Sequence, residues 1–184
     1  MTHASLTAIL RNRVLLSVAL LLGLASPSAS RAEDDAAIAS LQKAGGKIER
    51  DDKAPDKPVT VVNLGVTQAD DAAIAPVKGF GKIQKLTLNG TKITDAGLDN
   101  VKGLGSLRKL YLVDTKIGDA GVEKLKELKE LRILSLAGTG ITDAGLEHLK
   151  ALPNLEIVFL HGTKVTDEGV KKLKEALPKV KVEK

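Results

Sequence analysis

The sequence predicts an α/β solenoid, in which 24-residue strand–turn–helix units stack a parallel sheet on the concave face and helices on the convex face. Two observations lead to this fold class. One pattern recurs at intervals of 24 residues, and its clearest copy is LSLAGTGITDAGLEHLKALPNL at 134–155. Each copy starts with alternating apolar residues, which indicate a strand, and continues with apolar residues three apart, which indicate a short helix or 3₁₀ return.

Three columns of the repeat test this register. Positions chosen by the 24-residue step alone are all apolar: Leu64, Leu88, Leu112, Leu136, Leu160; Ile74, Leu98, Val122, Leu146, Val170; Val77, Val101, Leu125, Leu149, Leu173. Aromatic residues make up only 2% of the chain, so the core is expected to be aliphatic. A single unit cannot bury both its strand and its helix stripe, which is why several must stack.

Residues 1–32 have the pattern of an export signal. Arg11 and Arg13 form a charged start, residues 14–25 are apolar, and Ser30-Arg31-Ala32 offers small residues at a cleavage site. Twelve helical residues span about 18 Å, less than a hydrocarbon core of about 30 Å. We therefore expect general secretion with cleavage after Ala32. Cleavage after Ser30 and an uncleaved anchor are the alternatives.

The next segment, 33–58, is expected to be an N-terminal cap and a charged loop. Acids at Glu33 and beyond would open a short helix and face its dipole, and Gly45-Gly46 would end it. Residues 47–50 alternate as a brief strand does, and 51–58 form a Pro-punctuated loop. The solenoid proper would occupy 59–184, as about five units and a C-terminal edge with lysines outward.

Charge and composition exclude several classes of function. The net charge is +5, but the first 32 residues hold three arginines and no acid, so the rest of the chain is nearly balanced. This balance and the scarcity of aromatics argue against nucleic-acid binding. There are no cysteines, which removes disulfides, thiolate catalysis and Cys-ligated zinc. No nucleophile with a base, metal-ligand spacing or cofactor loop is present, so we expect no enzyme, metal or cofactor.

The repeat LxLxxTxITDAGLxxLxxLxxL resembles the leucine-rich repeat family. It is most similar to the cysteine-containing and ribonuclease-inhibitor-like variants, and to exported bacterial proteins with Thr-type repeats. The resemblance implies the solenoid fold and leaves the function open, because these repeats serve unrelated binding roles.

Where such repeats often use an asparagine ladder, this chain places threonines whose hydroxyls would donate to one backbone carbonyl and accept from one amide: Thr67, Thr91, Thr115, Thr139 and Thr163. A second column is expected to supply helix N-caps followed by first-turn acids facing the dipole: Thr94-Asp95, Gly118-Asp119, Thr142-Asp143 and Thr166-Asp167. Glycines two residues later should allow close packing between neighbouring returns: Gly97, Gly121, Gly145 and Gly169.

The outward strand positions carry the candidate binding residues. Most are small or polar, but Tyr111, Ile133, Ile157 and Phe159 would lie on adjacent strands about 4.8 Å apart. An exposed apolar cluster of this kind is typical of an interaction site, and Tyr is a favoured anchor. With the flanking Lys109 and His161, the candidate partner-binding residues are Lys109, Tyr111, Ile133, Ile157, Phe159 and His161. A lightly apolar face without a partner is the alternative.

These observations predict an exported, periplasmic or secreted, bacterial binding module without catalytic activity. Its partner would be a protein or a cell-envelope ligand, held on the concave sheet face. It would contact a membrane only through its export signal. The alternative is a structural or adhesive envelope protein that self-associates; the predicted state is a monomer or a weak self-associate.

Overall fold

The computed structural model describes residues 27–184. The chain divides into two compact units, and the boundary lies between Ala36 and Ala37. The predicted export signal falls mainly on residues 1–26, which lie outside the described residues. No helix of the described part is long and apolar enough to cross a membrane.

Helix α2 (Pro27–Lys43) begins six residues before Glu33, where the sequence predicted its start. Proline is favoured at the first position of a helix because the missing amide breaks no helical hydrogen bond there, so Pro27 can open α2. No acid lies in the first turn, and the expectation that Glu33 and its neighbours face the helix dipole is wrong. The predicted cleavage site at Ala32 lies within α2, and its use stays a prediction. Leu41, near the end of α2, is fully buried in the second unit.

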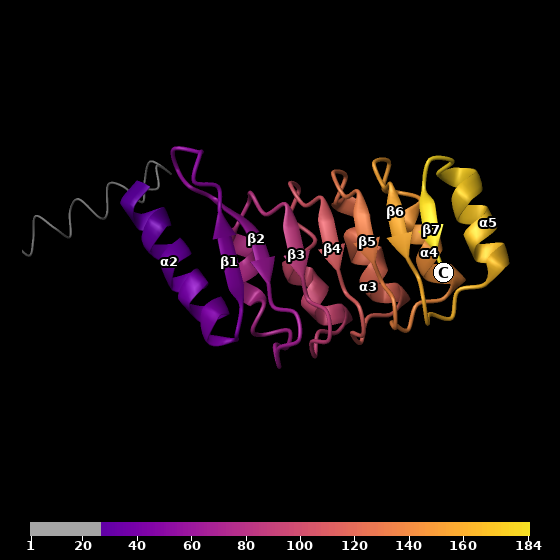
Figure 1. Cartoon of the computed structure of the whole chain (residues 1–184), viewed down its shortest axis with the longest axis horizontal. Coiled ribbons are helices and arrows are strands. Elements are labelled where there is room, and N and C mark those ends of the chain that lie inside the picture. Colours follow the sequence, from indigo (N-terminus) through magenta and orange to yellow (C-terminus); the bar gives the residue numbers. More distant parts are fainter. Residues whose placement is uncertain (1–26) are drawn as a thin grey trace, which may run out of the picture. The chain divides into compact units, whose positions relative to one another are not determined.

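Seven strands form one sheet in which spatial order follows chain order. The strands are β1 (Lys47–Arg50), β2 (Val59–Asn63), β3 (Lys85–Thr87), β4 (Lys109–Tyr111), β5 (Ile133–Ser135), β6 (Ile157–Phe159) and β7 (Lys181–Glu183). β1 pairs antiparallel with β2, and every later pair is parallel. Figure 1 shows the strands side by side with the helices of the units behind them. The predicted fold class, a mixed α/β solenoid with a mostly parallel sheet, is confirmed.

The sheet register reproduces the 24-residue step of the sequence. Leu86 pairs with Leu110, and Leu134 pairs with Val158. Each residue of one strand therefore lies beside its counterpart in the next unit. This alignment is what allows a repeated sequence position to become a continuous row on the sheet.

The returns behind the sheet change from 3₁₀ to α-helix along the chain. They are η1 (Ala75–Gly79), η2 (Asp95–Asn100), α3 (Asp119–Glu123) with η3 (Lys124–Glu127), α4 (Asp143–Leu149) and α5 (Asp167–Ala176). The early returns contain Pro76 or Asn100, which are poor helix formers, whereas α5 is rich in Lys and Glu. Local propensity thus sets the length and type of each return.

The core is aliphatic, as predicted. Fourteen of the fifteen predicted column positions are buried, and the exception is the half-buried Val170 in the last return. Five threonine hydroxyls each donate to the carbonyl three residues earlier, at 2.5–2.7 Å: Thr67, Thr91, Thr115, Thr139 and Thr163. Within the described residues only Thr67 also accepts an amide hydrogen, from Ala69. The predicted double role is therefore correct at one position only, and these bonds lie within a unit.

Candidate functional site

The exposed face of the sheet presents two rows of side chains that run across the strands. The first row is Glu49, Val61, Lys85, Lys109, Ile133, Ile157 and Lys181. The second row is Lys47, Asn63, Thr87, Tyr111, Ser135, Phe159 and Glu183. The first row passes from lysines at β3 and β4 to isoleucines at β5 and β6, whereas the second row has aromatic side chains at β4 and β6 with Ser135 between them. The face is thus divided by chemistry along its length.

The predicted apolar cluster is brought together, and we call Tyr111, Ile133, Ile157 and Phe159 the sheet-face patch. Ile133 and Ile157 are direct neighbours in the first row. Tyr111 and Phe159 flank Ser135 in the second row, and Ser135 is only 4% exposed because larger side chains surround it. The sequence predicted an exposed cluster, and all four patch residues are half-buried. The patch is a shallow surface with a small residue between two aromatic rings.

Charged groups border the sheet-face patch on both sides. The Nζ of Lys85 lies 5.9 Å from the centre of the Tyr111 ring, within the range of a cation–π contact. On the other side, Lys181 and Glu183 form an ion pair at 2.6 Å, and the hydrogen bond from Lys181 lowers the pKa of Glu183. His161 is exposed just beyond β6. At the β7 border, the charges of Lys181 and Glu183 therefore neutralise each other. At the β3 and β4 border, Lys85 and Lys109 face solvent without an acidic partner in the described chain.

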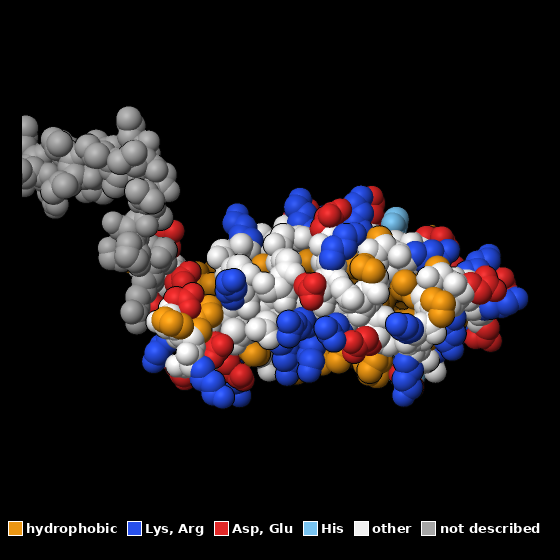
Figure 2. Space-filling model, turned by 90° about the horizontal axis from the view of Figure 1, so that it is seen from above, with side chains coloured by type: hydrophobic (Ala, Val, Ile, Leu, Met, Phe, Trp, Pro, Cys, Tyr) orange, Lys and Arg blue, Asp and Glu red, His pale blue; other side chains and the backbone are white. Residues whose placement is uncertain are grey.

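A hollow of about 540 Å³ lies beside the cationic part of the face. We call it the basic hollow; its lining is Arg50, Asp51, Thr60, Val61, Gln84, Lys85, Arg108 and Lys109. Figure 2 shows Lys and Arg side chains gathered beside the region that Figure 1 labels β3 and β4. The contributions of Arg50 and Arg108 were not predicted from the sequence. Arg108 precedes β4, where the two-residue strand period gives no direction, and Arg50 ends β1, whose antiparallel pairing with β2 the 24-residue repeat does not predict. The recurrence of Lys85 and Lys109 one unit apart was the available signal.

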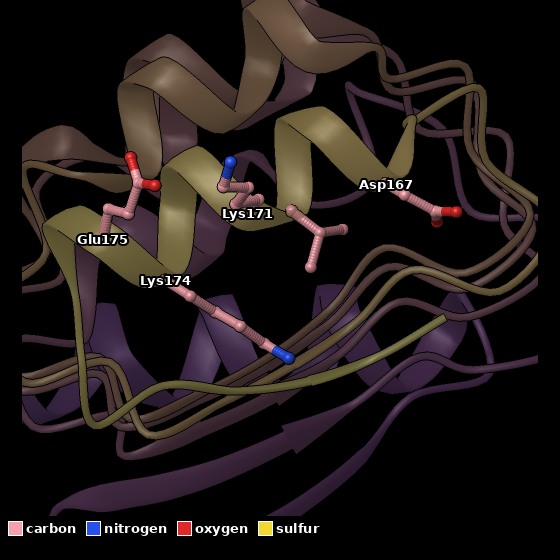
Figure 3. Close-up of a pocket in the computed structure, with 5 residues that line it drawn as sticks. Asp167, Lys171, Lys174 and Glu175 are labelled. Atoms are coloured by element: carbon pink, nitrogen blue, oxygen red, sulfur yellow. The ribbon is translucent and has the colours of Figure 1, made fainter.

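A second hollow, of about 410 Å³, lies along α5 and carries no comparable arrangement. Its lining is Asp167, Val170, Lys171, Lys174 and Glu175, all from one helix. Figure 3 shows the side chains of Lys171 and Glu175 pointing to one side of the helix and that of Lys174 to the other. Between residues 27 and 184 no group of three His, Asp or Glu side chains could hold a metal ion.

Comparison with known proteins identifies the repeat. The model of the leucine-rich repeat matches residues 106–126 and 129–150. These two stretches are similar to leucine-rich repeats. A search of curated proteins finds no match.

Several solved structures are similar to this chain at low sequence identity. An internalin from Listeria monocytogenes is 20% identical, with a TM-score of 0.50 over 67% of this chain and 40% of its own. The PEPR1–AtPEP1 structure is 18% identical, with a TM-score of 0.49 over 74% and 19%. A leucine-rich-repeat protein of Leptospira interrogans is 18% identical, with a TM-score of 0.44 over 60% and 33%. The chain thus matches less than half the length of each.

The aspartates of the repeat join one unit of this chain to the next. Asp119 accepts hydrogen bonds from the amide and the hydroxyl of Thr142, at 2.8 and 2.7 Å. The same pair of bonds links Asp71 to Thr94 and Asp143 to Thr166. We call these contacts, with the one at Asp95, the aspartate ladder. The predicted first-turn position of the acids is correct, but their hydrogen-bond partners lie in the following unit.

The threonines of the ladder also cap their own helices, as predicted. The hydroxyl of Thr142 accepts from the amide of Ala144 at 3.2 Å, and Thr94 and Thr166 act likewise. The glycines that follow make room for the ladder. A Cβ on Gly145 would lie 2.5 Å from the Asp119 carboxylate, and each of the other three would also meet the preceding unit's aspartate. The predicted close packing between returns is therefore confirmed, with a specific cause.

Hydrogen bonding in the ladder stabilises the ionised carboxylate. The side-chain and backbone donors of Thr166 lower the pKa of Asp143. A depressed folded-state pKa contributes stability that is present above the unfolded pKa and is lost as the pH falls through the folded pKa. This rung of the ladder therefore weakens only in acid.

One rung of the ladder is incomplete, and repairing it should stabilise the fold. Gly118 donates only its amide to Asp95, at 2.7 Å, because it has no hydroxyl. Its backbone is extended, and an added Cβ would be 3.5 Å from Asp95, an ordinary contact. Gly118→Thr should raise the free energy of unfolding by about 1 kcal/mol, through an added cap and a charge-assisted bond.

Urea unfolding would measure this gain, with Gly118→Ala as the matched control. Alanine also removes the flexibility of glycine but adds no hydroxyl. If both variants gain equally, the side-chain bond to Asp95 contributes nothing.

Proposed function

We propose that the chain is an exported, non-catalytic binding module that holds a protein partner on the exposed face of its sheet. The leucine-rich-repeat fold is typical of protein-interaction modules. The observation that carries the proposal is the sheet-face patch, where Tyr111, Ile133, Ile157 and Phe159 meet on three neighbouring strands. Half-buried aromatic anchors beside small residues supply binding energy without being needed for the core.

The proposal gives the other conspicuous residues structural roles. The aspartates and glycines of the repeat form the ladder, and the threonines cap helices and turns. What remains outside these roles is the variable set of strand residues, whose two carboxylates, Glu49 and Glu183, lie on the opposite edge strands β1 and β7. Such a set favours binding over acid–base or nucleophilic catalysis.

The site of action is proposed from the N-terminus. A charged start, an apolar stretch and small residues before Glu33 support export by general secretion. The partner would then be a protein of the periplasm, the cell envelope or the surroundings.

Replacing the aromatic anchors should abolish partner retention without unfolding the chain. The Tyr111→Ala and Phe159→Ala double variant removes half-exposed rings, so the thermal midpoint should change little while capture from an envelope extract is lost. The captured protein would be identified, purified and titrated against wild type and variant, and a loss of at least tenfold in affinity is expected. Val66→Ala is the matched control, because Val66 is an 89% exposed apolar residue outside the patch.

Equal retention by the double variant and wild type would refute the sheet-face patch as the binding surface. Self-association is distinguished by sedimentation of the purified protein alone. A size that grows with concentration, and that the double variant no longer shows, would replace the proposed partner by a second copy of the chain.

A further inference from the structure

The cations of the sheet face differ in whether they have acidic partners. Lys181 is paired with Glu183 at 2.6 Å, and Arg132, just before β5, is paired with Glu156 at 2.9 Å. In contrast, Lys85, Arg108 and Lys109 form no salt bridge and donate no side-chain hydrogen bond within residues 27–184. Three uncompensated positive charges on adjacent units create a local positive potential.

These three cations line the same concavity. The basic hollow holds Lys85, Arg108 and Lys109 together with the half-buried Arg50, and Asp51 is its single carboxylate. Polar neutral groups, Thr60 and Gln84, complete the wall. A concave surface with several convergent donors and an excess of positive charge suits a carboxylate better than a flat surface does.

We propose that the partner presents an acidic segment whose carboxylates enter the basic hollow while a neighbouring apolar side chain rests on the sheet-face patch. This inference rests on the proposed function and specifies the chemistry of the ligand. The two subsites are continuous, because Lys85, Lys109, Ile133 and Ile157 follow one another in the same row.

The register fixes the spacing that the ligand must have. The midpoint of Lys85 and Lys109 and the midpoint of Ile133 and Ile157 are two strand intervals apart, about 10 Å. An extended peptide covers this distance with about three residues. The ligand is therefore an acidic residue followed or preceded, three positions away, by a bulky apolar or aromatic residue.

The surroundings of the basic hollow favour a peptide over a nucleic acid. A nucleic-acid backbone requires a track of cations along several phosphates, and it prefers aromatic platforms for each base. Here the cationic row ends after Lys109, and the next two positions are isoleucines. Glu49 and Asp51 bound the hollow on its other side. The positive region is thus short and closed at both ends.

The experiment uses labelled probe peptides and the full-length chain. One probe has the order Glu-Asp-Ala-Ala-Phe-Leu, and a second has the reverse order, so that both orientations are sampled. Fluorescence anisotropy at low ionic strength measures binding. Matched probes carry Gln-Asn in place of Glu-Asp, and a spacing probe places the phenylalanine directly beside the acids.

Removing the positive charges of the two lysines should lower the affinity of the chain for the acidic probe by about tenfold. The test variant is Lys85→Gln with Lys109→Gln. The control is Lys92→Gln with Lys116→Gln, since these lysines are exposed, belong to the same two units and lower the net charge equally. The control should change binding by less than about twofold. The test variant should also lose the preference of wild type for the acidic probe over its amide counterpart.

Three results would overturn the inference. They are equal binding of acidic and amide probes, equal weakening by the test and control variants, and displacement of the probe by a short oligothymidylate at lower concentration than by unlabelled peptide. The Tyr111→Ala and Phe159→Ala variant separates this inference from the proposed function. If the aromatic variant no longer binds the probe while the lysine variant still does, the sheet-face patch is supported as the binding surface and the inference of an acidic ligand is wrong. If only the lysine variant no longer binds the probe, the patch is wrong.

Discussion

Replacing Gly145 by alanine should lower the free energy of unfolding by about 2–4 kcal/mol, although alanine is the better helix former. The added Cβ would lie 2.5 Å from an Oδ1 of Asp119 and would push that carboxylate away from its donors. The two bonds from Thr142, at 2.8 and 2.7 Å, would then be lost or lengthened. Urea unfolding followed by circular dichroism measures the change.

The cause can be isolated with a second substitution. Asp119→Ala removes the obstacle, and the next contact of the new Cβ is with Ile141 at 3.5 Å, which is ordinary. In that background Gly145→Ala should become neutral or stabilising by up to about 1 kcal/mol, because only the helix propensity of alanine remains. A reversal of sign identifies the carboxylate as the reason for the glycine. An unchanged cost in both backgrounds would mean that something other than Asp119 excludes a side chain at this position.

Leu136→Ala should destabilise the fold by about 2–5 kcal/mol, the range for a large-to-small change in a packed core. Leu136 is fully buried in the middle of the strand column, with units on both sides that cannot collapse into the cavity independently. Thermal and urea unfolding would both report the loss. The volume-conserving Leu136→Met is the control and should cost less than about 1.5 kcal/mol. If the two variants are equally stable, position 136 is not part of the core.

The fold could be predicted because apolar residues recur at equivalent positions in five units, and each of these positions must be buried. In a stacked array, a column of leucines such as Leu64 to Leu160 can avoid water only in the interior between the sheet and the returns. All five members of this column are buried. The start of α2 was predicted wrongly, because the acids at Glu33 and beyond indicated a helix start there, whereas the helix begins at Pro27. A proline can end one helix or occupy the first position of the next, and the local sequence alone does not decide between these two roles.

The site was predicted less completely. Periodicity shows toward which face of the sheet a side chain points, but it does not show how exposed the side chain is or which side chains it meets. The register did place Tyr111 and Phe159 on one face with Ser135 between them. It did not show that these rings are half-buried, or that Arg108 joins Lys85 and Lys109 in a hollow. Likewise the aspartates were assigned to their own helices, although an acid and a threonine 23 residues apart, almost one repeat, indicate a bond between units.

The single-bonded rung at Gly118 bears on how the array opens and folds. The adjacent rungs join neighbouring units through two bonds to one carboxylate, whereas Asp95 holds the next unit through one. Local unfolding that separates the array into two blocks at this junction therefore breaks one ladder bond fewer than at the adjacent junctions. Lys85 lies on one side of it and Lys109 on the other, so a ligand that contacts both lysines would also clamp the two blocks together. Binding on the sheet face would in this way raise the cooperativity of the whole solenoid.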